Sequence, residues 1–170
     1  MILGLDISTF CGAVFHSPDA EEFIVLHYRP EHPRFRRWHR YLSTLDALLD
    51  KHKPRYAVIE GYGFARTANI LPLVELGSLI RNQLTLRGIP WIEVAPSSLK
   101  KFTTGKGNAS KDEMVWAVND LWDIGTRDDN IADAYALSRL GRAFFDGEST
   151  SDRGQEVIDM LKGKSEVLHV

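Results

Sequence analysis

The sequence contains a single cysteine, Cys11, among its 170 residues. This excludes an internal disulfide and any zinc site built from cysteines, and we expect a reducing, cytosolic setting. No apolar stretch approaches the ~18 residues that a membrane span needs. The opening MILGLDIST has neither the basic start nor the long apolar segment of a secretory signal. The composition, 44% hydrophobic and 26% charged, is typical of a packed globular domain. A length of 170 residues suits one such domain and is too short for two.

Several enzyme motifs are also missing. The sequence has no HExxH, its six histidines lack the spacing of metal ligands, and Ser8 has no GxSxG context. The stretch from Gly105 to Lys111 lacks the GxxxxGK[ST] spacing and follows a predicted helix rather than a strand. These absences argue against zinc-protease, serine-hydrolase and P-loop chemistry.

Charge is distributed unevenly, although the formal net charge is only -2. Residues 27–55 hold eight Arg and Lys against three acids, whereas residues 146–170 hold six acids and three bases. Clustered arginines suit phosphate binding; the alternative is an ordinary solvated helix face. The arginines concerned lie on one predicted helix and are Arg34, Arg36, Arg37 and Arg40.

Hydropathy periodicity predicts an α/β fold. Three strands form an antiparallel meander and strand–helix crossovers follow, which together make a five-stranded mixed sheet flanked by helices. The predicted strands are Met1–Ser8, Cys11–His16, Glu22–Tyr28, Tyr56–Glu60 and Ile89–Val94. The predicted helices are Phe35–Leu49, Pro72–Arg87, Pro96–Phe102, Lys111–Trp122 and a last one from Thr126 to about Phe145. Residues 146–170 are expected to form a loosely ordered polar tail that the fold does not need.

Two acidic residues end predicted strands. Asp6 follows the apolar run of the first strand, and Glu60 ends the YAVIE strand. If these strands are neighbours, their ends lie roughly 5 Å apart. Carboxylates that close repel, and one pKa rises unless a cation joins them. Oxygen ligands favour magnesium or manganese over zinc. The alternative is that each acid simply starts a turn.

The last predicted helix carries a third acid. Asp129 and Asp133 are four residues apart and share a helix face. The helix dipole accounts for Asp129 in the first turn but not for Asp133, which lies among alanines beyond it. Such an acid is costly unless a metal or a donor meets it. Three acids from distant segments are therefore predicted to converge on a metal pair that suits phosphodiester hydrolysis.

Lysines surround this predicted centre. Lys111 follows the Ser110 cap at a helix start, a position that attracts phosphate. The alternative for Lys111 is a solvated surface side chain. The other lysines on nearby loop and helix positions are Lys100, Lys101 and Lys106.

Taken together, these segments resemble the RuvC-type Holliday-junction resolvases of the ribonuclease H-like superfamily. The matching blocks are LGLDIST at 3–9, VIEGYGF at 58–64, LGSLI at 76–80, VAPSSLKKFTTGKGNASKDEM at 94–114 and DDNIADAYAL at 128–137. They follow the family's order and cover about residues 1–145, which we expect to form the nuclease domain. The block from Pro96 to Lys111 is the most specific, since sugar-kinase and actin-type ATPases share a similar first block.

The resemblance implies a homodimer that cuts two opposed strands of a four-way DNA junction by hydrolysis, in recombination and repair. It implies Mg²⁺ or Mn²⁺, two ions per site, with Asp6 bridging both and Glu60 and Asp133 binding one each. The family's fourth ligand falls on Asn130 here, with Asp129 one residue earlier. Both therefore stay candidates.

By position, Lys100 and Lys111 match the family's functional lysines near the scissile phosphate. Some relatives insert an aromatic ring at the junction from the third residue after the glutamate. This chain has Gly63 there, so Tyr62 or Phe64 would stack on a base instead, or pack in the core. The Leu-rich helix over residues 72–87 is expected to form the dimer contact.

Two other functions stay open at this point. One is a less selective nuclease for many branched DNAs, and the other is a junction-binding protein without catalysis. The three acids argue against the latter, because carboxylates that face phosphate weaken binding. A sugar-kinase-type ATPase needs a second domain, for which 170 residues leave no room.

Overall fold

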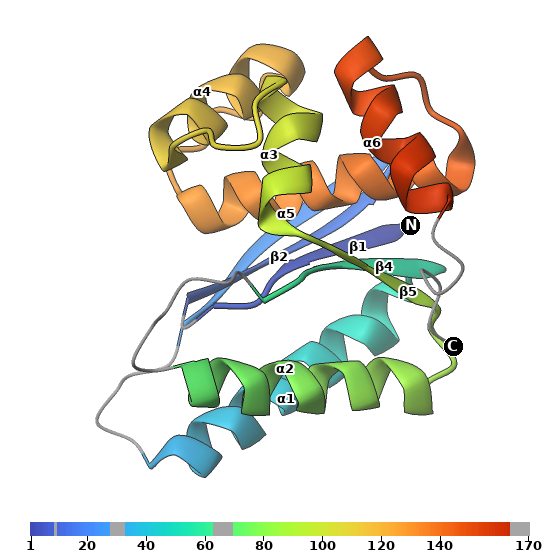
Figure 1. The fold of residues 1–170 in the computed structure, drawn as a ribbon. Helices are drawn as coiled ribbons and strands as arrows, with labels where there is room; N and C mark the ends of the chain where they lie inside the picture. The colour runs from blue at the N-terminus through green and yellow to red at the C-terminus, as the bar shows by residue number, and fades with distance from the viewer. Residues whose placement is uncertain (9, 28–32, 63–69, 164–170) are drawn as a thin grey trace.

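The computed structural model describes residues 1–8, 10–27, 33–62 and 70–163. The chain begins with three successive strands, then alternates between helices and strands, and ends with successive helices (Figure 1). Its elements are β1 (Ile2–Asp6), β2 (Phe10–Ser17), β3 (Ala20–His27), α1 (Arg34–His52), β4 (Tyr56–Glu60), α2 (Ile70–Leu86), β5 (Trp91–Val94), α3 (Pro96–Thr104), α4 (Lys111–Trp122), α5 (Asp129–Gly141), the π-helical turn η1 (Arg142–Asp146) and α6 (Asp152–Lys162). Among the described helices, none is long and apolar enough to cross a membrane.

The five strands form one mixed sheet in the order β3-β2-β1-β4-β5. The first three strands are antiparallel, and β4 and β5 run parallel to β1. Helices α1 and α2 cover one face, and α3 to α6 cover the other (Figure 1). This architecture confirms the predicted α/β fold, and it makes β1 and β4 direct neighbours.

Strand alternation decides which side chains reach each core. Leu3 and Leu5 pack against α1 and α2, whereas Ile2 and Val58 belong to the core under α5. Successive side chains of a strand point to opposite faces. Asp6, four residues after Ile2, and Glu60, two residues after Val58, therefore fall on the α5 face of the sheet.

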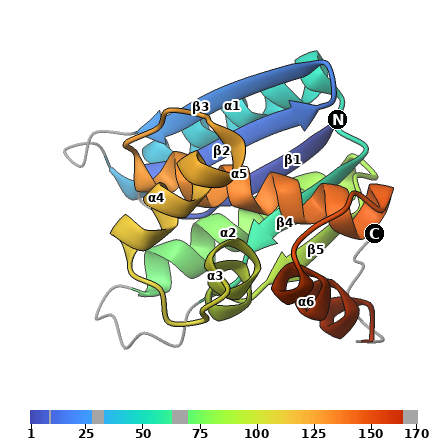
Figure 2. The same ribbon diagram turned by 90° about the horizontal axis from the view of Figure 1, so that it is seen from above.

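Helix α5 lies across β1 and β2, as the view from above shows (Figure 2), and packs against both strands. The approach depends on glycine: a β-carbon at Gly4 would overlap the carbonyl oxygen of Ala134, and one at Gly12 would overlap that of Asn130. Both obstacles are backbone atoms, which cannot swing aside. The two glycines, which have no side chains, thus allow α5 to lie close to the sheet.

Local capping explains where two helices of the site begin. Ser110 and Glu113 form a reciprocal capping box at the start of α4, as expected. Asp128 caps α5 by accepting from the backbone N–H groups of Asn130 and Ile131, so that α5 begins at Asp129. At its other end α5 gives way to η1 at Arg142, three residues short of the predicted end.

The expected loose tail is wrong for residues 152–162, which form helix α6. Its apolar side chains Val157, Ile158 and Leu161 are 1–2% exposed and join the core beside α3. The composition of this segment is polar because its outer face is solvated, while a narrow stripe is buried.

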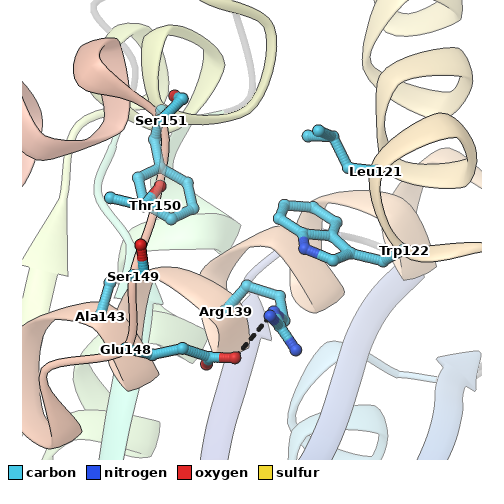
Figure 3. A pocket seen from close by; sticks show the side chains of 9 residues that line it. Leu121, Trp122, Arg139, Ala143, Glu148, Ser149, Thr150 and Ser151 are labelled. Carbon is cyan, nitrogen blue, oxygen red and sulfur yellow. Dashed lines mark hydrogen bonds and ion pairs between the residues drawn. The ribbon is translucent and has the colours of Figure 1, made fainter.

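The chain that leads to α6 is also held in place. Glu148 accepts hydrogen bonds from Arg139 (2.6 Å) and Arg142 (2.7 Å). It borders a cavity of about 260 Å³ between α4, α5 and the segment before α6, where Figure 3 draws its contact with Arg139. None of the predicted site residues lines this cavity.

Candidate active site

Asp6 and Glu60 meet at the carboxyl edge of the sheet. The parallel register pairs Leu5 with Ile59, so the acids that follow them are adjacent. Their side chains share a hydrogen bond, and Asp6 is only 6% exposed. Burial raises the pKa of Asp6 well above its usual range, and the charges of Glu60 and Asp133 add to the rise. Burial also raises the pKa of Glu60.

Asp133 completes this cluster from above. It lies in the second turn of α5, between the fully buried Ala132 and Ala134. Burial raises its pKa to about 7, and the negative charges of Glu60 and Asp129 act in the same direction. The structure thus brings together all three acids that the sequence singled out, from β1, β4 and α5.

The chemistry of this cluster fits a divalent cation. Among the described residues, no group of three or more His, Cys, Asp and Glu is arranged so that it could hold a metal ion as it stands. Charging the three carboxyls is costly, because all three are buried and the charge of Glu60 acts on both Asp6 and Asp133. A cation would offset both costs, and an oxygen-only donor set favours magnesium or manganese. Asp6, Glu60 and Asp133 are the residues that would hold it.

Two lysines surround the carboxyls with positive charge. Lys111, the first residue of α4, forms an ion pair with Asp129 at the start of α5, and its side chain is 75% exposed. The charge of Lys111 lowers the pKa of Asp6, Glu60 and Asp133. Lys100 on α3 acts in the same way on Glu60 and Asp133. Both lysines predicted to face the scissile phosphate therefore lie beside the acids.

Asn130 is engaged in internal hydrogen bonds. Its Nδ2 donates to Oδ1 of Asp128 (3.0 Å) and of Asp129 (3.4 Å), while its Oδ1 accepts from the Ser8 hydroxyl at 3.1 Å. Asp129 is paired with Lys111, and this hydrogen bond lowers its pKa. Of the two candidates for a fourth ligand, Asp129 thus carries the charge, while Asn130 links α5 to the end of β1.

The other two predicted DNA-binding lysines do not join the cluster. Lys101 forms an ion pair with Glu156 on α6 (2.8 Å), and its contact with DNA stays a prediction. The side chain turns away because consecutive helix positions point in different directions. Lys106 is exposed and lies 3.6 Å from Glu113 at the start of α4.

The arginine-rich helix α1 lies on the opposite face of the sheet from α5. Its first turn lies at the same end of the molecule as the carboxyl edge (Figure 1). Arg36 and Arg40 are exposed and open to an anion. Arg34 is already paired with Glu75 (3.0 Å), and the Arg37 guanidinium lies over the Trp38 ring.

Tyr62 is attached to α2 through its hydroxyl group. The hydroxyl donates to the carbonyl of Val74 (3.2 Å) and accepts from Arg81 (2.9 Å). These bonds favour the alternative in which Tyr62 packs within the protein, and stacking of its ring on a base stays a prediction. Phe64 lies outside the described residues. Sequence reasoning missed the Arg81–Glu93 pair, for which the acid inside the apolar strand WIEV was a signal.

Comparison with known families gives a match over most of the chain. The family model described as crossover junction endodeoxyribonuclease RuvC matches residues 20–139, which include Glu60 and Asp133 but begin after Asp6. The RuvC of Synechococcus sp. (strain WH7803) is 33% identical over 99 residues, 57% of this chain and 64% of that relative. The RuvC of Brachyspira hyodysenteriae is 37% identical over 97 residues, 56% of this chain and 61% of that relative. The chain thus spans less than two thirds of the length of these curated relatives.

Solved structures agree on the fold. The structure of Thermus thermophilus RuvC has a TM-score of 0.69 at 18% identity and covers 88% of this chain and 98% of its own. A second structure, of T. thermophilus RuvC in complex with a Holliday junction substrate, has a TM-score of 0.66 at 20% identity and covers 81% and 89%. At such identities the likeness concerns the ribonuclease H-like fold alone.

Proposed function

Because this chain belongs to the RuvC family of crossover junction endodeoxyribonucleases, we propose that it resolves four-way DNA junctions by paired hydrolytic nicks in opposed strands. The proposal includes Mg²⁺ or Mn²⁺, two ions per site, and a homodimer acting in recombination and repair. The complex of T. thermophilus RuvC with a Holliday junction substrate supports this choice of DNA. Residues 1–145 stay the predicted nuclease domain.

The observation that carries the proposal is the gathering of three buried carboxyl groups whose pKa values are all raised above their usual range, chiefly by burial. Asp6, Glu60 and Asp133 come from segments far apart in the sequence, and each is costly to ionise where it lies. A protein that only binds DNA gains nothing from such a cluster, since carboxylates repel phosphate. Strongly perturbed groups gathered by several elements are typical of active sites.

Each acid has a distinct place in the proposed mechanism. As the family resemblance implies, Asp6 would help to hold both cations, while Glu60 and Asp133 would each hold one. Asp129 is the better candidate for a fourth ligand, because the Asn130 oxygen already accepts from Ser8. Bound divalent cations supply Lewis acidity that activates water and stabilises the leaving oxygen of a phosphodiester.

The lysines act on the phosphate. Lys111 lies at the N-terminus of α4, where the helix dipole and free backbone N–H groups favour an anion. Its exposed ammonium would exchange Asp129 for a phosphate oxygen and stabilise the charge that develops in the transition state. Lys100 adds positive charge beside Glu60 and Asp133.

DNA approach and dimer formation use other surfaces. Arg36 and Arg40 on α1, together with Lys106, would contact the backbone of a junction arm. Helix α2 leaves Leu71, Leu79 and Leu86 exposed, at 61%, 38% and 79%. Covering these leucines in a symmetric dimer would place two sites on two opposed strands.

Cleavage of matched substrates tests the proposal. Four-way, three-way and linear duplex DNAs of equal length, labelled on each strand in turn, should be incubated with the protein and Mg²⁺ or Mn²⁺. We expect paired nicks at symmetric positions in the four-way junction and little cutting of the others. Asp6→Asn should bind the junction as well as wild type or more tightly, because a negative charge is removed, yet cut nothing.

Other outcomes distinguish the alternative functions. Equal cutting of all branched DNAs would identify a broader processing nuclease. Tight junction binding without nicks at any Mn²⁺ concentration would identify a catalytically inactive binding protein. Loss of junction binding in Asp6→Asn would give Asp6 a structural role instead.

A further inference from the structure

Arg81 on α2 links two segments: it bonds to Tyr62, just after the end of β4, and to Glu93 on β5. Its Nε and Nη2 donate to Oε2 of Glu93 at 3.1 and 2.7 Å, and its Nη1 donates to the hydroxyl of Tyr62 at 2.9 Å. The guanidinium carbon lies 4.7 Å from the centre of the Tyr62 ring. The Arg81 side chain is only 14% exposed, so that solvent screens these contacts weakly. One cation thus holds an aromatic ring and a carboxylate together.

The two residues that directly follow Glu60 are both hydrogen-bonded, Gly61 through its backbone and Tyr62 through its side chain. The N–H of Gly61 donates to the carbonyl of Val94 at 2.8 Å. The hydroxyl of Tyr62 donates to the carbonyl of Val74 at 3.2 Å, besides accepting from Arg81. The strand exit is therefore attached to β5 on one side and to α2 on the other.

Two glycines make room for this arrangement. A β-carbon on Gly61 would lie 2.8 Å from Oε1 of Glu93. One on Gly77 would overlap the Tyr62 hydroxyl and lie 2.6 Å from Nη1 of Arg81. A side chain at either position would therefore displace Glu93, Tyr62 or Arg81 from this arrangement.

We propose that Arg81, Glu93 and Tyr62 form a positioning clamp that holds the carboxyl group of Glu60 beside that of Asp6. The inference rests on the proposed function, in which Glu60 binds a divalent cation. Two carboxylates that repel each other separate unless the backbone carrying them is restrained. β4 lies between β1 and β5 and pairs with β5 as far as Glu60 and Val94, and the clamp continues this restraint to the residues just beyond the strand.

None of the three clamp residues touches the reacting atoms, so their effect should appear in cation binding. Residues that orient the ligands of a metal change its affinity by about 10–100-fold when they are replaced. We expect Arg81→Lys to weaken Mn²⁺ binding within this range, because one ammonium nitrogen cannot reproduce the fork that donates through Nε and Nη2 to Glu93 and through Nη1 to Tyr62. Tyr62→Phe removes a single hydroxyl and keeps the ring, and it should weaken binding in the same direction.

The experiment is calorimetric titration of the full chain with Mn²⁺ in the absence of DNA. The matched control is Arg87→Lys, since Arg87, which directly follows α2, binds Asp46 and Asp50 through similar contacts away from the site. Glu60→Gln is measured alone and combined with Arg81→Lys. We expect Glu60→Gln to weaken binding, Arg87→Lys to leave it unchanged, and Arg81→Lys to have no further effect in the Glu60→Gln background.

The failures of the two proposals are distinguishable. If Glu60→Gln binds Mn²⁺ like wild type, the proposed cation site is wrong and the clamp falls with it. If Glu60→Gln weakens binding but Arg81→Lys and Tyr62→Phe do not, the clamp is wrong and the proposed function stands. An equal loss in Arg87→Lys, or an undiminished effect of Arg81→Lys in the Glu60→Gln background, would likewise overturn the clamp, because the loss would then not act through Glu60.

Discussion

The ammonium group of Lys111 is hydrogen-bonded to the carboxylate of Asp129, which joins the first residues of α4 and α5. This bond raises the pKa of Lys111 and lowers that of Asp129, so both groups stay charged at neutral pH. The ion pair keeps the positive charge of Lys111 at the edge of the cluster formed by Asp6, Glu60 and Asp133. Lys111 is 75% exposed on its side chain, and it can leave Asp129 for a stronger anion.

Lys111→Ala should slow single-turnover cleavage of a four-way junction by about 10²–10³, the usual cost of losing one donor to the transition state. Junction affinity should change little, because one exposed charge contributes modestly to binding. The control is Lys51→Ala, which removes an exposed lysine paired with Glu22. Unchanged turnover in Lys111→Ala would make Lys111 an ordinary surface lysine.

Asp133 should make the stability of the cation-free protein depend on pH. In the folded state the pKa of Asp133 is raised to about 7, from its usual value of 3.8, so the folded protein keeps this proton up to about pH 7. Between these values the folded state binds more protons than the unfolded state, so this group's contribution to stability falls as the pH rises from about 4 to about 7. Asp133→Asn should therefore melt at least ~2 °C above wild type at pH 8, the shift that about 1 kcal/mol produces in a domain of this size, and near wild type at pH 4.

The matched control for this measurement is Asp129→Asn. The pKa of Asp129 is lowered by its bond to Lys111, so its removal should lower the melting temperature at pH 8. Added Mn²⁺ should raise the melting temperature of wild type more than that of Asp133→Asn, because a ligand stabilises the state that binds it. Equal melting temperatures of wild type and Asp133→Asn at both pH values would contradict the raised pKa of Asp133.

The exposed arginines of α1 should govern the salt dependence of DNA binding. Replacing both Arg36 and Arg40 with alanine should reduce the slope of log K against log salt by about 2, since each phosphate contact contributes roughly 0.9. Fluorescence anisotropy of a labelled junction between 50 and 200 mM salt measures this slope. Arg55→Ala, at the opposite end of the sheet, should leave the slope unchanged. An unaltered slope in the double variant would identify α1 as a solvated helix face.

Helix α6 should contribute to stability. Leu161 is 2% exposed, and Leu161→Ala should cost about 2–5 kcal/mol in the free energy of unfolding. Met160 on the same helix is 42% exposed, and Met160→Ala should stay within about 0.5 kcal/mol of wild type. Urea denaturation of both variants makes the comparison. A truncation before Ser149 should also melt lower than the full chain, and an unchanged melting temperature would restore the view of a dispensable tail.

The sheet and its order of elements were predictable because strand and helix periods differ clearly in this chain. The alternating run before Asp6 and the three- and four-residue spacing after Phe35 leave little doubt about either element. Helix α6 escaped prediction because only a narrow apolar stripe, with Val157 and Leu161, interrupts a polar composition. Its partner is the surface of α3, which no local pattern reveals.

The candidate site was partly predictable for a similar reason. Asp6 and Glu60 end strands, so the pattern predicted that they meet on the condition that the two strands are neighbours, and the sheet order meets that condition. The engagement of Asn130 with Ser8 joins residues 122 positions apart and leaves no local trace. Nor does the sequence say whether the ring of Tyr62 faces DNA or packs on α2, since an aromatic residue suits both.

The narrow gap between α5 and the sheet has a consequence for how this protein can change. Asp133 is part of α5, and α5 can pack this closely on the sheet only because Gly4 and Gly12 have no side chains. A single methyl group at either glycine would lift the helix and carry one acid out of reach of the other two, although every charged residue remained. Tolerance to substitution is therefore narrowest at two uncharged positions that never touch DNA.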